Sequence, residues 1–172
     1  MGAALRRPLV LTGPPAVGKS SSARELARRR ARAALVDVDD VRQLVLTGGE
    51  APWRGEEGAA QALLGVVNAC GLARNFLDAG FDVVVVDVLT PVTAAAVREH
   101  LPGALLVHLV VDLDEARTRA ATRRVWLTER EFSGLHARDV TSPPDVDVAL
   151  DVTHLDMAEQ VASVEALWAA RS

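Results

Sequence analysis

The sequence predicts an α/β fold in which helices cover both faces of a five-stranded parallel sheet. Strand-like and helix-like patterns alternate along nearly the whole chain of 172 residues, which is typical of βαβ units with right-handed crossovers. Three of the expected strands are almost continuous runs of β-branched residues or leucine, as in parallel strands buried on both faces. Hydrophobic residues make up 49% of the chain, enough for one domain over residues 1–172 with a substantial core.

The elements follow one another in a regular order. Strands are expected over residues 9–12, 34–38, 83–88, 105–111 and 146–152, and helices over residues 19–31, 40–47, 57–79, 92–101, 113–124 and 157–170. The first helix places Leu26 and Ala27 on one face at helical spacing. The long third helix stops before Gly80, a residue typical of helix C-termini. The last helix begins with Asp156 followed by Glu159, the spacing of a capping box.

Two segments break this alternation. The first, Thr47 to Gly55, is rich in glycine and contains Trp53. The second, residues 125–144, contains His136 and two prolines and is expected to be an irregular lid. Long irregular insertions in compact domains often bind substrates or close over them.

The composition argues against several classes of partner. The net charge of −4 favours neither nucleic acid nor an anionic membrane as a partner. The basic run over residues 28–32 is interpreted as positive charge at the end of a helix. No apolar run reaches the roughly 18 residues of a membrane span, and the single cysteine, Cys70, agrees with a reducing cytoplasm. No pattern favours a particular oligomeric state.

The strongest motif surrounds the only lysine of the chain, since the other eighteen basic residues are arginines. Residues 13–20 fit G-x-x-x-x-G-K-[ST], a phosphate-binding loop (P-loop), between an expected strand and an expected helix. The lysine is expected to reach the β- and γ-phosphates of a nucleoside triphosphate, and Ser20 to bind Mg²⁺. The expected nucleotide-binding residues are Gly13, Pro14, Pro15, Ala16, Val17, Gly18, Lys19, Ser20 and Ser21.

Carboxylates follow two of the expected strands. Asp37 and Asp39 come at the end of the second strand, where ligands of parallel sheets bind. Either could accept a proton from an attacking hydroxyl, position that hydroxyl or hold Mg²⁺ through water, although Asp39 or Asp40 could instead cap the next helix. Asp87 ends the valine-rich third strand and is expected to reach Mg²⁺ or its water.

The expected helix over residues 113–124 adds positive charge. Arg119 and Arg123 are spaced i,i+4 and therefore share a face. They are expected to stabilise charge on the transferring phosphoryl group or to stack on adenine. His108 is expected to be a satisfied core residue, and His136 has no supported role.

Together these residues resemble small P-loop kinases, most closely the chloramphenicol phosphotransferase-like group. The matching blocks are residues 10–20, 38–39, 79–88, 119–123 and 147–154, and residues 37–42 also resemble adenylylsulfate kinases. The resemblance implies a three-layer P-loop kinase fold with a short lid, ATP with Mg²⁺, and Asp39 as the base toward an acceptor hydroxyl. The chain departs from this group over residues 44–61 and in the lid, which form the acceptor pocket in such kinases. Chloramphenicol is therefore unsupported, and antibiotics or other secondary metabolites are candidate acceptors.

The acceptor is expected to bind near Asp37 and Asp39, with Trp53 as an apolar wall and Arg42 and Arg54 as polar contacts. Trp53 could equally be a core residue that packs its loop. Two other functions stay open. A nucleoside or nucleotide kinase would need several arginines for the acceptor phosphates, and a nucleotide-binding switch would need no acceptor.

Overall fold

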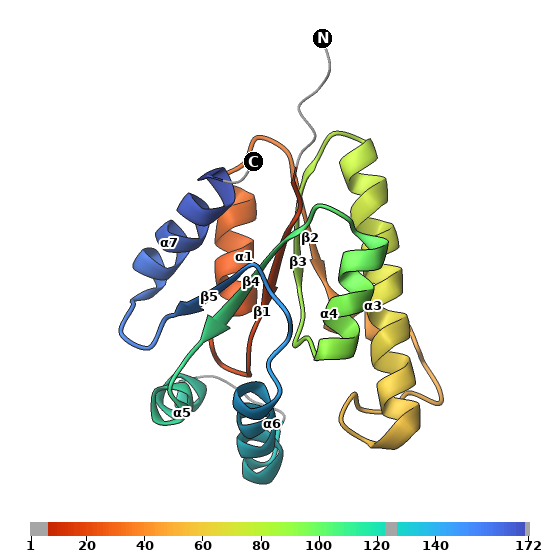
Figure 1. Cartoon of the computed structure of the whole chain (residues 1–172), viewed down its shortest axis with the longest axis vertical. Helices are drawn as coiled ribbons and strands as arrows, with labels where there is room; N and C mark the ends of the chain where they lie inside the picture. The colour runs from red at the N-terminus through yellow and green to blue at the C-terminus, as the bar shows by residue number, and fades with distance from the viewer. Residues whose placement is uncertain (1–6, 123–126, 171–172) are drawn as a thin grey trace.

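The structure is a computed structural model that describes residues 7–122 and 127–170. It confirms an α/β fold with a five-stranded parallel sheet in the order β2-β3-β1-β4-β5 (Figure 1). All four strand pairs are parallel. The strands are β1 Leu9–Thr12, β2 Ala33–Asp37, β3 Asp82–Val86, β4 Leu105–Val110 and β5 Val148–Asp151.

Helices cover both faces of the sheet, with α1 and α7 on one side and α3 and α4 on the other (Figure 1). The helices are α1 Lys19–Arg28, α2 Val38–Arg42, α3 Gly55–Asp78, α4 Pro91–His100, α5 Leu113–Ala121, α6 Glu129–Thr141 and α7 Met157–Ala170. None of the helices in the described part of the chain combines the length and apolar character needed to cross a bilayer.

The strands divide the core because successive residues of a strand face opposite sides of the sheet. In β1, Leu9 and Leu11 pack in the cluster that includes side chains of α1 and α7. Val10 packs in the second cluster with side chains of α3 and α4. The continuous apolar runs that predicted buried parallel strands therefore each supply both cores.

Two expectations about the elements are wrong. The helix expected over residues 40–47 is α2, which is shorter and ends at Arg42. It begins at Val38 because Asp37 caps it, accepting a hydrogen bond from the Asp39 N–H at 3.1 Å. The segment over residues 125–144 is not irregular in its described part, since it contains the 13-residue helix α6. A capping box between Thr128 and Glu131 starts this helix.

The fold places the P-loop where the strand order branches. Strand β1 lies between β3 and β4. After β1 the chain forms β2 and β3 on one side of it, and later β4 and β5 on the other side. Ligands of open parallel sheets bind at such a point, outside the carboxyl ends of the strands. Helices α5 and α6 lie at this same end of the sheet (Figure 1).

Candidate functional site

The backbone of the P-loop is held in conformations that most residues avoid. Gly13 and Gly18 have φ angles of 142° and 97°. A Cβ at Gly13 would lie 2.3 Å from the Leu109 carbonyl oxygen of β4, so the loop can pass this strand only as glycine. Ala16 also has a positive φ, 64°, although it has a side chain. The left-handed region costs such a residue about 1–2 kcal/mol, so neighbouring contacts must stabilise it.

Side chains bind the P-loop carbonyl groups. Because the N–H and C=O of a peptide unit point in opposite directions, fixing the carbonyls also fixes the direction of the amides that would bind an anion. Lys19 Nζ donates to the Gly13 and Pro14 oxygens at 2.7 and 2.8 Å. His136 Nε2 donates to the Pro15 oxygen at 3.0 Å. The Val17 oxygen accepts from Gln160 Nε2 at 3.1 Å and from Arg119 Nη1 at 3.4 Å.

The predicted metal residue Ser20 lies beside Asp37. The Ser20 hydroxyl donates to Asp37 Oδ2 at 3.2 Å, which joins the first turn of α1 to the end of β2. Burial raises the pKa of the Asp37 carboxyl, and the hydrogen bond from the Asp39 N–H opposes this. Mg²⁺ prefers oxygen ligands and completes its shell with phosphate oxygens and water. The hydroxyl and carboxylate oxygens of this pair therefore fit Mg²⁺.

Asp39, Arg42 and Asp87 form a connected group at the same end of the sheet. Both oxygens of Asp87 accept from the Arg42 guanidinium at 2.8 Å, and Arg42 also donates to Asp39 Oδ1 at 2.8 Å. The Asp87 side chain is 2% exposed, whereas that of Asp39 is 73% exposed. Burial raises the pKa of Asp87, and its hydrogen bonds with Arg42 act against this. Asp87 therefore contacts Arg42 here, and Asp37 is the carboxylate beside Ser20.

Gly65 of α3 makes room for Arg42. A Cβ at this position would lie 2.9 Å from Arg42 Cγ and 3.2 Å from its Nε. Because both Nη atoms of Arg42 are bound to Asp87, the stem of the side chain has little freedom to move aside.

We expect Gly65→Ala to destabilise the protein by about 1–3 kcal/mol, the usual cost of overpacking. Gly71→Ala is the matched control on the same helix, because a Cβ at Gly71 would meet no atom within 4 Å. The control should be neutral or stabilising by up to about 1 kcal/mol. Thermal unfolding of both variants checks this, and equal melting temperatures would contradict the packing argument.

Arg119 lies beside the loop that follows β5. Its Nη2 donates to the carbonyl oxygens of Val152, Thr153 and Leu155 at 2.8, 3.4 and 3.3 Å, and its Nε donates to Glu115 at 2.8 Å. The guanidinium thus joins the P-loop to the β5–α7 loop. Arg123 lies outside the described residues.

The predicted acceptor loop contacts α6. Trp53 is half-buried, and its Nε1 donates to Glu131 Oε1 at 3.2 Å. The other oxygen of Glu131 accepts from the Thr128 N–H and hydroxyl, both at 2.9 Å. Arg54 is 65% exposed and pairs with Glu50 at 3.5 Å. Trp53 is therefore fixed between the loop before α3 and the first turn of α6.

Sequence reasoning missed three residues of this site. His136 and Gln160 bind P-loop carbonyls, and Glu131 binds Trp53. The spacing of Thr128 and Glu131 is a capping-box signal that could have revealed α6. No local signal identifies Gln160, because its partner Val17 is 143 residues away in sequence.

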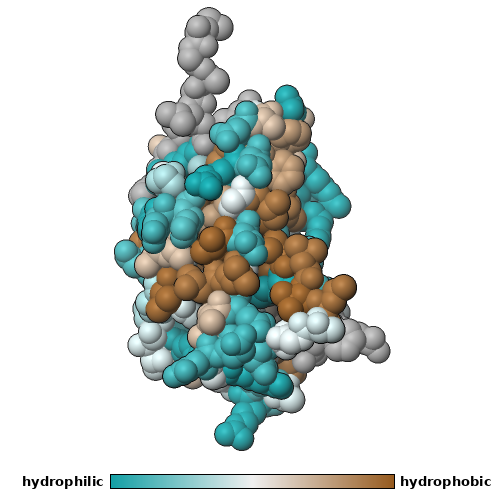
Figure 2. All heavy atoms as spheres, turned by 90° about the vertical axis from the view of Figure 1, so that its right-hand side faces the viewer, coloured by the Kyte–Doolittle hydropathy of each residue, from teal (hydrophilic) through white to brown (hydrophobic). Residues whose placement is uncertain are grey.

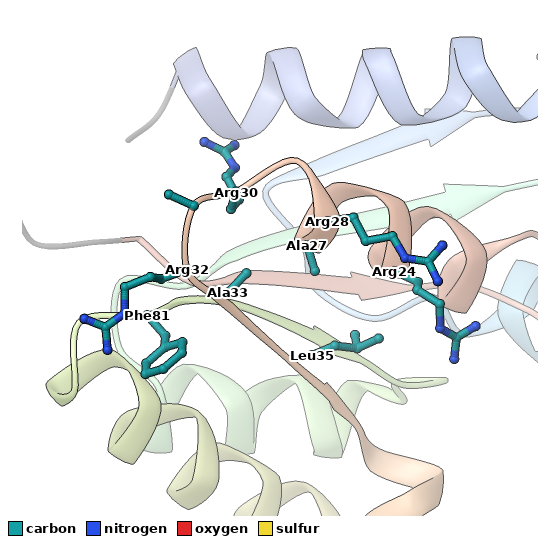
Figure 3. Close-up of a pocket in the computed structure, with 9 residues that line it drawn as sticks. Arg24, Ala27, Arg28, Arg30, Arg32, Ala33, Leu35 and Phe81 are labelled. Carbon is teal, nitrogen blue, oxygen red and sulfur yellow. The ribbon is translucent and has the colours of Figure 1, made fainter.

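A basic hollow lies at the opposite end of the sheet from the P-loop. It has a volume of about 480 Å³ and is lined by Arg24, Arg28, Arg30 and Arg32, among other residues. Figure 3 shows Arg24 and Arg28 extending to one side, whereas Arg30 and Arg32 point elsewhere. Arg30 lies 4.2 Å from the ring centroid of Trp168, and Arg32 lies 4.4 Å from that of Phe81. The guanidinium groups do not converge, so the hollow lacks the geometry of a built anion site.

Known structures share this fold. A gluconokinase from Sinorhizobium meliloti superimposes with a TM-score of 0.70 at 20% identity, covering 98% of this chain and 94% of that one. The tunicamycin resistance protein of Deinococcus radiodurans gives 0.66 at 16% identity, with 95% and 96% covered. A shikimate kinase from Bacteroides thetaiotaomicron gives 0.65 at 15% identity, with 94% and 97% covered. No family model matches the chain, and no curated protein is significantly similar in sequence. Identities this low establish the shared fold alone.

Proposed function

We propose that this protein is an ATP-dependent phosphotransferase that moves the γ-phosphate to a hydroxyl group of a small molecule. The observation that carries the proposal is the contact between Ser20 of the P-loop helix and Asp37 of β2, with Asp39 two residues further on. It brings a phosphate-binding loop, an oxygen pair for Mg²⁺ and an exposed carboxylate to one edge of the sheet. Phosphoryl transfer requires these three parts.

In this proposal the P-loop holds the triphosphate through its backbone amides, Lys19 and the start of α1. Ser20 and Asp37 would hold Mg²⁺, whose positive charge would offset the negative charge of the phosphate oxygens. Asp87 contributes indirectly, because it fixes Arg42 through two hydrogen bonds and Arg42 in turn contacts Asp39. Arg119 holds the loop after β5 beside the P-loop through hydrogen bonds to carbonyl oxygens of both loops. Arg123 stays a proposed contact to the transferred phosphate or the adenine.

Asp39 is the proposed base. Its Oδ1 accepts from Arg42, which orients the carboxylate, while the side chain as a whole remains 73% exposed. An oriented and accessible carboxylate suits a group that accepts the proton of an incoming hydroxyl as its oxygen attacks phosphorus. Arg42 also places a positive charge 2.8 Å from Asp39 Oδ1, which holds this carboxylate in one orientation.

The acceptor side of the proposed site is partly apolar. Leu44 and Leu46, directly after α2, are 75% and 91% exposed, and Trp53 closes the far end of this loop. A hydrophobic band also crosses the face covered by α3 and α4 (Figure 2). The exposed leucines and Trp53, which belong to the loop between α2 and α3, support an acceptor with an apolar part, and such an acceptor suits an antibiotic or another secondary metabolite better than a sugar acid.

The arginine positions weigh against a nucleotide as acceptor. Arg42 is bound to Asp39 and Asp87, and Arg54 is paired with Glu50. Arg74 and Arg138 are exposed on α3 and α6. An acceptor phosphate would need convergent guanidinium groups, so a neutral hydroxyl compound fits the site better. The resemblance to chloramphenicol phosphotransferases agrees with this and is kept as part of the proposal.

The test is ADP release from MgATP with and without pooled alcohols, comprising polyol acids, nucleosides and hydroxylated antibiotics. We expect at least one pool to raise ADP release about 10-fold or more above the rate in water, because an enzyme positions its acceptor far better than water. Tight ATP binding without stimulation by any pool would favour a nucleotide-binding switch and contradict the proposal.

Trp53→Ala should raise the Michaelis constant for the acceptor about 10-fold, because an aromatic wall contributes about 1–3 kcal/mol of apolar contact. The constant for ATP should not change. Trp53→Phe is the matched control, since it keeps an aromatic ring, although a smaller one, and loses the hydrogen bond to Glu131. Steady-state kinetics with each substrate varied in turn check this, and an effect confined to ATP or to melting temperature would remove Trp53 from the acceptor site.

A further inference from the structure

The structure assigns a positioning role to His136, and this inference rests on the proposed function. We propose that His136 of α6 holds the peptide unit between Pro15 and Ala16 in the orientation that binds phosphate. His136 touches neither the proposed base nor the metal pair. It acts through the P-loop backbone, so it is a positioning residue and not a catalytic one.

The contact is well defined. His136 Nε2 lies 3.0 Å from the Pro15 oxygen, and the residue is 4% exposed. A carbonyl oxygen only accepts, so the ring must carry its proton on Nε2. Phe132, one turn earlier, packs against the imidazole with ring centroids 4.7 Å apart. Burial lowers the pKa of His136, which favours the neutral ring.

Ala16 explains why the loop needs such a contact. Its φ of 64° lies in the left-handed region, which disfavours a residue with a Cβ. Rotation of the Pro15–Ala16 peptide plane would return φ to negative values. The same rotation would turn the Ala16 N–H away from the phosphate position and replace it with the Pro15 oxygen. The preference of alanine therefore opposes phosphate binding, and the hydrogen bond from His136 opposes that rotation.

Helix α6 is itself anchored, so it can act as a support. Asp139, one turn after His136, accepts from Nε2 of His108 in β4 at 2.9 Å, and both side chains are almost fully buried. Glu131, at the first turn, binds Trp53. The helix is thus attached to the sheet at one end and to the acceptor loop at the other, with His136 between them.

The test compares His136→Phe, which keeps a buried ring without a donor, with His136→Gln, which restores an N–H near the position of Nε2. His136→Phe should raise the Kd and the Michaelis constant for ATP about 10-fold or more, because it leaves a buried carbonyl without a partner. The kcat at saturating ATP should change less than about threefold, since bound ATP restores the loop. His136→Gln should recover most of the affinity.

Two further measurements separate positioning from general destabilisation. In an Ala16→Gly background the cost of the left-handed conformation is absent. The loss of affinity caused by His136→Phe should therefore be smaller there, by a factor of about five or more. Trp168→Phe is the control for general destabilisation, because Trp168 is buried in α7 and its Nε1 donates to the Arg7 carbonyl oxygen at 2.8 Å rather than to α6 or the P-loop. It should lower the melting temperature and leave the Kd for ATP within about twofold of that of the parent.

The ligand-free crystal structure of His136→Phe decides the inference without any nucleotide. We expect a negative φ at Ala16 and a rotated Pro15 carbonyl. An unchanged loop, an unchanged Kd, or a Gln variant as weak as the Phe variant would overturn the positioning role. If the parent protein fails to bind ATP, the proposed function fails separately, and the crystal structure still tests the role of His136 in the loop.

Discussion

Lys19→Ala is expected to lower the rate of phosphoryl transfer by at least about 100-fold, because the site loses the compact positive charge that follows the phosphate into the transition state. The fold should survive. In the structure Lys19 is the first residue of α1, and its Nζ donates to the carbonyl oxygens of Gly13 and Pro14 in the P-loop. The ammonium is therefore already directed into the loop that would hold the phosphates.

The measurement is acceptor-dependent ADP release, with thermal unfolding as the check on the fold. Lys19→Arg is the informative companion, because it keeps the charge and changes a flexible ammonium into a wide planar guanidinium. It should remain severely impaired. An alanine variant that melts like the parent and retains more than about a tenth of its rate would contradict the P-loop assignment.

Asp39→Asn should lower kcat by roughly 100-fold or more, with little change in the Kd for ATP, as expected for a positioned acid–base group. Asparagine has nearly the same shape and can still accept the hydrogen bond that Arg42 donates to Oδ1 of Asp39. The substitution therefore removes the proton acceptor and largely keeps the geometry. Rapid-quench or steady-state rates at saturating ATP and acceptor measure the effect.

Asp37→Asn is the comparison that separates the two carboxylates. Asp37 contacts Ser20 and caps α2, so its loss should raise the Mg²⁺ concentration needed for half-maximal activity. At saturating Mg²⁺ the remaining defect should be smaller than that of Asp39→Asn. If Asp37→Asn is the more damaging change under those conditions, the proposed base is wrong by two residues.

The fold was predictable because the apolar runs of β1, β3 and β4 are long, continuous and separated by helical patterns. Most apolar residues in these runs contribute to a core on one face or the other, as Val10 and Leu11 do on opposite sides of β1. The sequence pattern therefore reflects the burial directly. Helix α6 was missed because its inward-facing side chains include the polar groups of His136 and Asp139 beside Phe132, so the sequence shows little apolar periodicity there.

The residues of the candidate site were predictable where they belong to one contiguous motif. They were not predictable where the pairing of strands in the sheet brings distant residues together. The P-loop is contiguous, so its residues could be assigned from spacing. The pairing of Arg42 with Asp87 depends on β2 and β3 being neighbours, and it joins residues 45 positions apart. The sequence placed Asp87 near Mg²⁺ from its position after a strand, and it gave no sign that a guanidinium contacts both of its oxygens.

The fate of the γ-phosphate tests the central claim most directly. Phosphorus NMR of a reaction containing MgATP and the alcohol pool that most stimulates ADP release distinguishes a phosphate ester from inorganic phosphate. We predict a new phosphomonoester signal that grows in step with ADP and is absent with the Lys19→Ala variant. If inorganic phosphate alone accumulates in step with ADP, the protein transfers the phosphoryl group to water, and the assignment of an acceptor hydroxyl is wrong.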